Sequence, residues 1–181
     1  MAHVNLVDPA SANASAKPTL DQINGAFGVV PNMFKAVANS PAALASMWGA
    51  FGALGGGKLG ARLGEEIAVA IANANTCEYC LAAHTALGKK AGASGDEMAE
   101  AQIGKSADPR TQAALTFALK VVRDRAAVTQ SDVAALKTAG FDDEGVVEII
   151  AHVALNLFTN YVNVALDVPV DFPGVRLKQA A

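Results

Sequence analysis

Signals that start and stop helices recur along almost the whole chain and leave little sequence for other regular structure. Ser40 before Pro41 is typical of an N-cap followed by a proline in the first helical position, and Ser94 and Glu97 have the spacing of a capping box. Between such signals, apolar residues recur every three or four positions, as they do across 61–73. No segment alternates apolar and polar residues as a half-buried strand does. We therefore predict an all-α fold.

The expected helices divide the chain into an arm and one domain. Residues 1–17 are small, polar and aperiodic, which predicts a flexible or draped N-terminal arm. Residues 18–181 are expected to form a single helical domain. Thr76 is expected to cap the helix that carries the cysteines. The expected helices cover about 18–25, 31–37, 41–54, 61–73, 77–90, a short stretch around Met98, 109–122, 133–139 and 143–166.

Charge and hydrophobicity narrow the function classes. The net charge is −3 and no basic stripe exists, so we expect no nucleic-acid partner. The most apolar run, Val146–Leu157, is interrupted by Glu148, His152 and Asn156, so we expect no membrane span. Hydrophobic residues make up 52% of the chain and charged residues 17%, an apolar surplus that favours burial between copies. We therefore expect a homo-oligomer.

The N-terminus has no basic stretch followed by an apolar core, so we expect no secretory signal and a cytoplasmic location. The chain has two cysteines, Cys77 and Cys80. In a reducing compartment a close pair of this kind is more often catalytic or metal-binding than a structural staple.

The segment from Cys77 to His84 is the strongest functional signal. A helix that begins at Thr76 or Cys77 places both cysteines in its first turn, where backbone N–H groups and the helix dipole favour a thiolate. The i, i+3 spacing brings Cys77 and Cys80 to one face, close enough for a reversible disulfide. His84 lies four residues beyond Cys80 on the same face and can exchange a proton with a thiol. This set predicts a redox or nucleophilic cysteine site.

Two other interpretations of the pair remain. Cys77 and Cys80 provide half of a tetrahedral zinc site, but only His3, His84 and His152 offer nitrogen ligands and no second cysteine pair exists. The pair is also compatible with two buried structural cysteines. We favour the redox site, with no metal and no cofactor.

Several neighbours have roles that the residues alone leave open. Either Glu65 or Glu66 can reach His84 if the preceding helix folds antiparallel onto the cysteine helix. Tyr79 either gates the pocket or packs there. The final helix carries a polar stripe that either lines the pocket, bonds to neighbouring helices or lies at a subunit contact, and we favour structure or assembly over catalysis. The stripe consists of Glu148, His152, Asn156, Asn160 and Asn163.

The spacing Glu65-x11-Cys77-x2-Cys80-x3-His84 resembles the signature of the alkylhydroperoxidase D (AhpD)-like branch of the carboxymuconolactone decarboxylase superfamily. The similarity extends over nearly the whole chain after the arm and points to the peroxidase-related members of the branch. Flanking segments that carry it are Gly28–Phe34, Ser40-Pro41, Glu148–Asn163 and Val170–Pro173.

The resemblance implies an all-helical fold that assembles as dimers, trimers or hexamers. It implies a thiol peroxidase for hydrogen peroxide or organic hydroperoxides, recycled by a dithiol or a redox protein. By position, Cys80 resembles the attacking cysteine and Cys77 its resolving partner. Glu65, rather than its neighbour, and His84 resemble the proton relay.

One position departs from the pattern of the family. The best-known peroxidases of the group have a histidine immediately before the second cysteine, where this chain has Tyr79. Two alternative functions are a carboxymuconolactone decarboxylase-like lyase, with His84 and Glu65 as acid and base, and a non-enzymatic redox sensor or scaffold.

Overall fold

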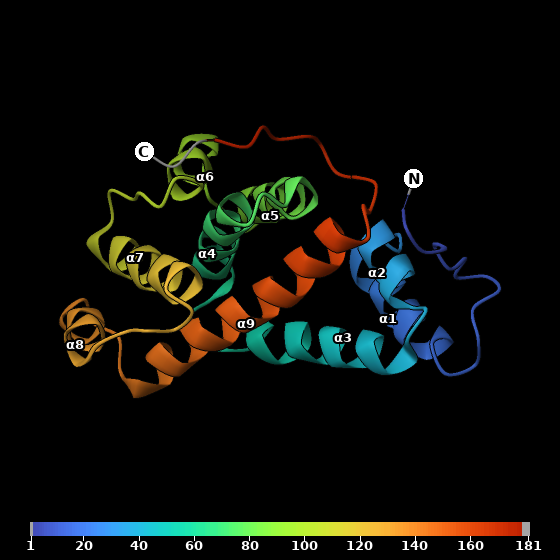
Figure 1. Ribbon diagram of the computed structural model, residues 1–181, viewed down its shortest axis with the longest axis horizontal. Coiled ribbons are helices and arrows are strands. Elements are labelled where there is room, and N and C mark those ends of the chain that lie inside the picture. Colours follow the sequence, from blue (N-terminus) through green and yellow to red (C-terminus); the bar gives the residue numbers. More distant parts are fainter. Residues whose placement is uncertain (1, 179–181) are drawn as a thin grey trace.

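In the computed structural model, which describes residues 2–178, all regular structure in that range is α-helical (Figure 1). The all-α prediction is confirmed for this part of the chain. The helices are α1 (Lys17–Phe27), α2 (Asn32–Val37), α3 (Pro41–Gly55), α4 (Ala61–Ala74), α5 (Glu78–Lys90), α6 (Gly95–Ala101), α7 (Pro109–Arg123), α8 (Gln130–Thr138) and α9 (Asp143–Ala165).

Local capping explains most of the helix boundaries. The Ser40 hydroxyl accepts a hydrogen bond from the Ala43 N–H at the start of α3. Ser94 and Glu97 form a complete capping box on α6, as the sequence predicts. Gly28 ends α1 in the left-handed conformation, with φ of 77°, which glycine adopts without steric cost.

The predicted cap of α5 is wrong by one residue. Thr76 has φ of 54° and its hydroxyl donates to the Asn75 carbonyl, so it does not cap the helix. Cys77 is the N-cap instead, because its backbone is extended and its sulfur accepts the Cys80 N–H at 3.2 Å. A cysteine sulfur therefore takes the place usually held by a hydroxyl or carboxylate oxygen.

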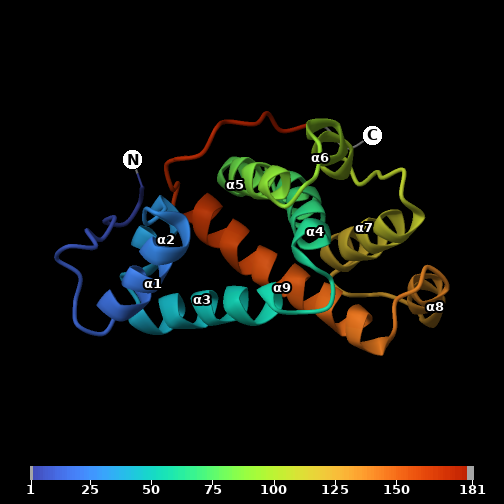
Figure 2. The ribbon, with the colours of Figure 1, turned by 180° about the vertical axis from the view of Figure 1, so that it is seen from behind.

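The long helix α9 runs through the molecule and contacts α2, α3, α4, α5, α7 and α8. Figure 1 and the reverse view in Figure 2 show α1 and α2 near the C-terminal end of α9, and α8 near its N-terminal end. By length and composition alone α9 could cross a membrane, but a core helix of a globular domain passes the same test. Because α9 packs against six other helices, we interpret it as a core helix of the domain.

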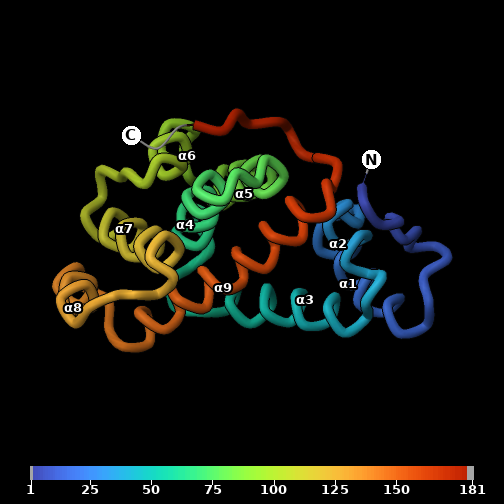
Figure 3. Tube along the Cα trace, viewed as in Figure 1, coloured from blue at the N-terminus to red at the C-terminus, as the bar shows by residue number. Residues whose placement is uncertain are grey.

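Both ends of the chain are held against the helices. In the N-terminal segment the His3 N–H bonds to the Leu166 carbonyl at 2.7 Å, and the Val7 N–H bonds to the Lys35 carbonyl at 3.1 Å. The C-terminal tail leaves α9 and crosses α5 toward α6 (Figure 3). Extended segments with these bonds are draped over the domain.

Two buried amides hold the tail against the helices. Asn73 exchanges two 2.9 Å hydrogen bonds with the backbone of Lys178, and the Gln102 amide donates to the Arg176 carbonyl at 2.8 Å. Gln102 also donates to Asn73 at 2.9 Å, so the two buried amides satisfy each other as well as the tail. The tail is thereby fixed across the start of α5.

Candidate functional site

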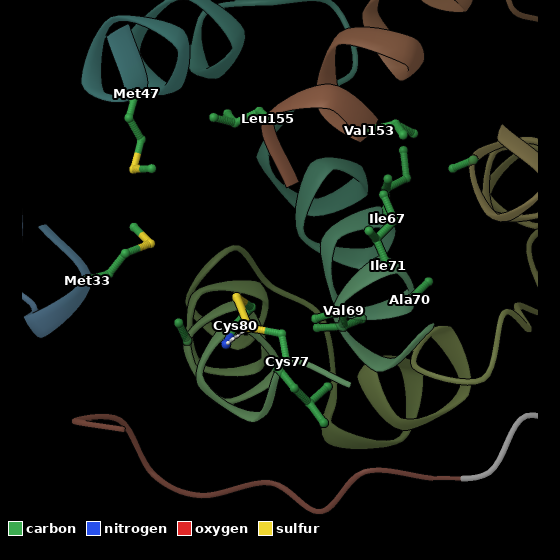
Figure 4. Packing of buried hydrophobic residues seen from close by; sticks show 14 of the residues in the cluster. Met33, Met47, Ile67, Val69, Ala70, Ile71, Cys77, Cys80, Val153 and Leu155 are labelled. Atoms are coloured by element: carbon green, nitrogen blue, oxygen red, sulfur yellow. Dashed lines mark hydrogen bonds between the residues drawn. A yellow bond between two sulfur atoms is a disulfide. The ribbon is translucent and has the colours of Figure 1, made fainter. Parts of the chain in front are cut away.

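The two cysteines lie at the start of α5 and are joined by a disulfide. Cys77 is 1% exposed and Cys80 is 2% exposed, so neither sulfur meets bulk solvent directly. Figure 4 shows the pair on α5, with Val69 of α4 nearby and Met33 and Met47 across the apolar interior. Because Cys77 is the N-cap and Cys80 lies in the first turn of a thirteen-residue helix, reduced sulfurs there would feel the positive end of its dipole.

Helix α4 packs closely along α5 and places one glutamate beside the histidine. Glu65 Oε2 lies 2.7 Å from His84 Nδ1, and the His84 side chain is 10% exposed. A carboxylate at this distance fixes which ring nitrogen carries the proton and holds the ring in place. The sequence left open whether Glu65 or Glu66 reaches His84, and the packing of α4 on α5 decides it in favour of Glu65.

Glu66 points elsewhere. Its carboxylate pairs with Arg62 Nε at 3.3 Å, and the side chain is buried. Burial raises the pKa of Glu66, and the Arg62 guanidinium opposes this rise. Adjacent residues on a helix are rotated by about 100°, so only one of the two glutamates faces α5.

A cavity of about 300 Å³ opens beside Cys80. Its polar groups come from Cys80, His84, Glu65, Thr159 and Asn163. The rest of the wall is apolar and rich in aromatic rings. The aromatic residues are Phe27, Phe34, Trp48, Phe51, Tyr79 and Phe172. A mostly apolar cavity with a few convergent polar groups is the usual form of a small-molecule site.

Asn163 connects the last helix to the cysteine pair. Its side-chain Nδ2 donates to the sulfur of Cys80 at 3.2 Å, and the residue is 3% exposed. The sequence placed Asn163 on a polar stripe but gave no reason to link it to Cys80. The two residues are 83 positions apart, so only the tertiary fold shows the contact.

Tyr79 packs in the wall of the cavity. Its hydroxyl accepts the Met33 N–H at 3.2 Å, and its ring meets Phe172 edge to face with centroids 5.8 Å apart. Burial raises the pKa of Tyr79 well above its ordinary value, and Asp171 adds to the rise. The side chain is therefore a neutral wall residue at ordinary pH, in the place where the resemblance leads one to expect a histidine.

The polar stripe on α9 divides into parts with different surroundings. Glu148 accepts the backbone N–H groups of Lys58 and Leu59, so it holds the loop between α3 and α4. Asn160 accepts the Asn75 amide at 2.9 Å. These contacts with the segments before and after α4 agree with a structural role for that part of the stripe.

His152 lies behind the Glu65–His84 pair. It lines a smaller cavity, of about 140 Å³, together with Glu65, His84 and Asn156. Its Nε2 atom is buried and has no hydrogen-bond partner among the described residues. Burial lowers the pKa of His152, Glu148 and Glu65 oppose this, and His84 adds to it. His152 thus belongs to the surroundings of the site. This matches one of the three alternatives that the sequence left open for the polar stripe, namely that it lines the pocket.

No group of three or more His, Cys, Asp or Glu side chains suited to a metal is assembled anywhere in residues 2–178. Of the candidate metal ligands named from the sequence, Cys77 and Cys80 bond to each other and His84 bonds to Glu65. The disulfide and the histidine–carboxylate pair account for these side chains.

Comparison with known proteins gives a family and a fold. The family model described as the carboxymuconolactone decarboxylase family matches residues 40–124. No curated protein sequence matches the chain. Residues 40–124 contain Glu65, both cysteines and His84.

Solved structures resemble nearly the whole chain. An uncharacterized peroxidase-related protein with an alkylhydroperoxidase AhpD core from Ralstonia eutropha JMP134 is 27% identical, with a TM-score of 0.81 over 94% of this chain and 92% of that one. A peroxidase-related protein from Silicibacter sp. TM1040 is 24% identical, with a TM-score of 0.82 over 93% and 91%. The debrominase Bmp8, in complex with 2,3,4-tribromopyrrole, is 20% identical, with a TM-score of 0.79 over 94% of each chain.

Proposed function

Because the chain belongs to the AhpD and carboxymuconolactone decarboxylase superfamily, we propose that it is a thiol-dependent peroxidase for organic hydroperoxides or hydrogen peroxide. The observation that carries the proposal is the position of Cys80, which lines a cavity beside the His84–Glu65 pair and is within bonding distance of Cys77. A peroxidase of this kind needs an attacking thiol, a resolving thiol and a proton donor.

In the first step the reduced Cys80 thiolate attacks the terminal oxygen of the hydroperoxide in the cavity beside Cys80. The O–O bond breaks, Cys80 becomes a sulfenic acid, and the departing alkoxide takes a proton. His84 can supply this proton because it lines the same cavity and Glu65 holds its ring. Asn163 stabilises the thiolate through its N–H donor.

In the second step the Cys77 thiol attacks the sulfur of the sulfenic acid. The S–O bond breaks, the hydroxyl leaves as water with the proton from Cys77, and the disulfide forms. The Cα atoms of the pair are 5.4 Å apart, within the usual range for a disulfide. A thiol reductant then supplies two electrons and restores both cysteines.

The cavity wall disfavours the lyase alternative. A muconolactone-like acid carries a carboxylate, which buried sites usually bind through Arg or Lys. Among the described residues that line the cavity beside Cys80 there is no Arg or Lys. The apolar, aromatic wall suits an uncharged organic hydroperoxide better than a carboxylic acid.

Steady-state turnover tests the proposal. The reduced protein should consume cumene hydroperoxide in the presence of dithiothreitol, and one equivalent of peroxide should remove two free thiols. Cys80→Ser should abolish turnover, whereas Cys77→Ser should leave a sulfenic acid that dimedone traps. Oxidation that occurs once without turnover would instead support a redox sensor, and full activity of Cys80→Ser would refute the assigned attack.

The aromatic wall favours a second candidate, reductive dehalogenation of a small halogenated aromatic compound. The likeness to the debrominase Bmp8 shows only the fold, but six aromatic residues around Cys80 offer flat apolar surfaces for such a ring. In this reaction the two cysteine thiols give two electrons, the ring gains a proton in place of the halogen, halide leaves with the second proton, and the disulfide forms. Bromide release from a bromopyrrole, without peroxide present, would identify this activity.

A further inference from the structure

The disulfide separates two cavities. One, of about 300 Å³, is lined by Cys80 but not by Cys77. A second cavity, of about 310 Å³, is lined by Cys77 but not by Cys80. Tyr79 and Asn163 line both, so these two side chains and the disulfide form the partition between them.

The two cavities differ in chemistry. The one beside Cys80 is almost entirely apolar, whereas the one beside Cys77 has polar and apolar surface in similar amounts. The wall of the second cavity includes the carboxylate of Glu78, and none of the described residues that line it is Lys or Arg. Residues 167–170, where the chain leaves α9, form another part of its wall. An apolar peroxide and a polar thiol therefore have different sides of the pair available to them.

The hydrogen bonds at the pair favour one direction of cleavage. When a thiolate attacks a disulfide, it approaches in line with the S–S bond and the far sulfur leaves. Attack on Cys77 makes Cys80 the leaving sulfur, and Asn163 already donates to that sulfur at 3.2 Å. His84 lines the cavity beside Cys80 and can return a proton to it. Because Cys77 is only 1% exposed, a thiol reaches it through the second cavity.

We propose that the cavity beside Cys77 is the reductant site, and that it takes a thiol without net negative charge. This inference rests on the proposed thiol cycle but concerns only its reductive half. The first thiolate bonds to Cys77 sulfur, the S–S bond breaks and Cys80 leaves as a thiolate. A second thiol attacks the external sulfur of the mixed disulfide, releases Cys77, and leaves as the oxidised reductant; two thiols have then supplied two electrons and two protons.

Mapping the mixed disulfide tests the direction of attack without any peroxide. The protein is oxidised with diamide, exposed briefly to 2-mercaptoethanol, and quenched with acid and N-ethylmaleimide. Tandem mass spectrometry then shows which cysteine carries the mercaptoethanol adduct. The adduct is expected on Cys77 with maleimide on Cys80. An adduct mainly on Cys80 would overturn the proposal, whether or not the protein proves to be a peroxidase.

Two variants test the cavity and its charge. Val170→Trp, which fills the second cavity, should slow reduction by cysteamine about 10-fold, while Val29→Trp, at an exposed position between α1 and α2, should not. Glu78→Gln should raise the rate with glutathione, which is anionic, relative to the rate with cysteamine. Unchanged reduction in Val170→Trp, with native circular dichroism, would exclude this cavity as the route. An unchanged ratio in Glu78→Gln would exclude the charge preference.

Discussion

The side-chain amide of Asn163 donates a hydrogen bond to the sulfur of Cys80, from the last helix to the first turn of α5. A donor on a sulfur stabilises its thiolate form, and a bond to a charged group contributes about 1.5–3 kcal/mol. Removal of this donor should therefore be visible in the reactivity of Cys80 and not only in stability.

Asn163→Leu should slow alkylation of reduced Cys80 by iodoacetamide about 10-fold at pH 7, because the loss of about 1.4 kcal/mol or more lowers the thiolate fraction by that factor. The measurement is the alkylation rate between pH 5 and pH 10 in a Cys77→Ser background. Asn160→Leu serves as the matched control, since Asn160 is buried on the same helix but bonds to Asn75. Equal pH profiles for Asn163 and Leu at this position would contradict a role in thiolate stabilisation.

Glu65→Gln should lower kcat/KM for hydroperoxide by about 100-fold, because His84 loses the carboxylate that orients it. The pH dependence of kcat/KM should change as well, which a purely structural role would not produce. Glu66→Gln is the neighbouring control: its carboxylate pairs with Arg62, so the rate should remain at the original level. A similar loss in both variants would point to damage to α4 instead.

Tyr79→Phe should lower the free energy of unfolding by about 1–3 kcal/mol, because the Met33 N–H loses its partner in a buried setting. Urea denaturation of the oxidised protein measures the change. Tyr161→Phe, at an exposed position, should have no effect. Because the raised pKa keeps Tyr79 neutral, the pH dependence of turnover should be the same in Tyr79→Phe. If one of the pH-dependent steps of that profile disappeared in the variant, the Tyr79 hydroxyl would have to titrate during the reaction.

His152 should make the fold sensitive to acid. Its pKa in the folded state lies below the ordinary value of 6.5, so as pH falls through 6.5 the unfolded chain takes up the proton first. The contribution of His152 to the free energy of unfolding therefore decreases as the pH falls below about 6.5, and it levels off below the folded-state pKa. His152→Gln should reduce the difference in stability between pH 7.5 and pH 5.5, measured by urea denaturation. An identical difference in the variant would contradict this.

Four exposed apolar side chains lie on one face of α9, and we expect a second copy of the chain to cover this face. They are Val147, Ile150, Tyr161 and Val164. We expect sedimentation equilibrium to give a multiple of the monomer mass, and Ile150→Lys to lower it. Glu100→Lys, a charge change on α6, should leave the mass unaltered. A monomer at all concentrations would contradict the expectation.

Most helix positions could be predicted from the sequence, because helix ends are set by hydrogen bonds between residues that are close along the chain. Ser40 and Ser94 cap the helices they were expected to cap, and Gly28 ends α1. The cap of α5 could not be predicted in the same way, because Thr76 and Cys77 both have a side chain that can accept a hydrogen bond. The backbone path from α4 decides that Cys77 is the cap.

The sequence by itself determined the chemistry that the site can offer, since i, i+3 and i, i+4 spacing on one helix places Cys77, Cys80 and His84 on a common face. Tertiary structure decided the rest. Packing of α4 on α5 selected Glu65 over Glu66, and α9 delivered Asn163 to Cys80 from 83 residues away. The two cavities beside the disulfide likewise depend on which side chains meet across helices. Local spacing cannot carry that information, because it is fixed by the relative position of helices and not by the turn of one.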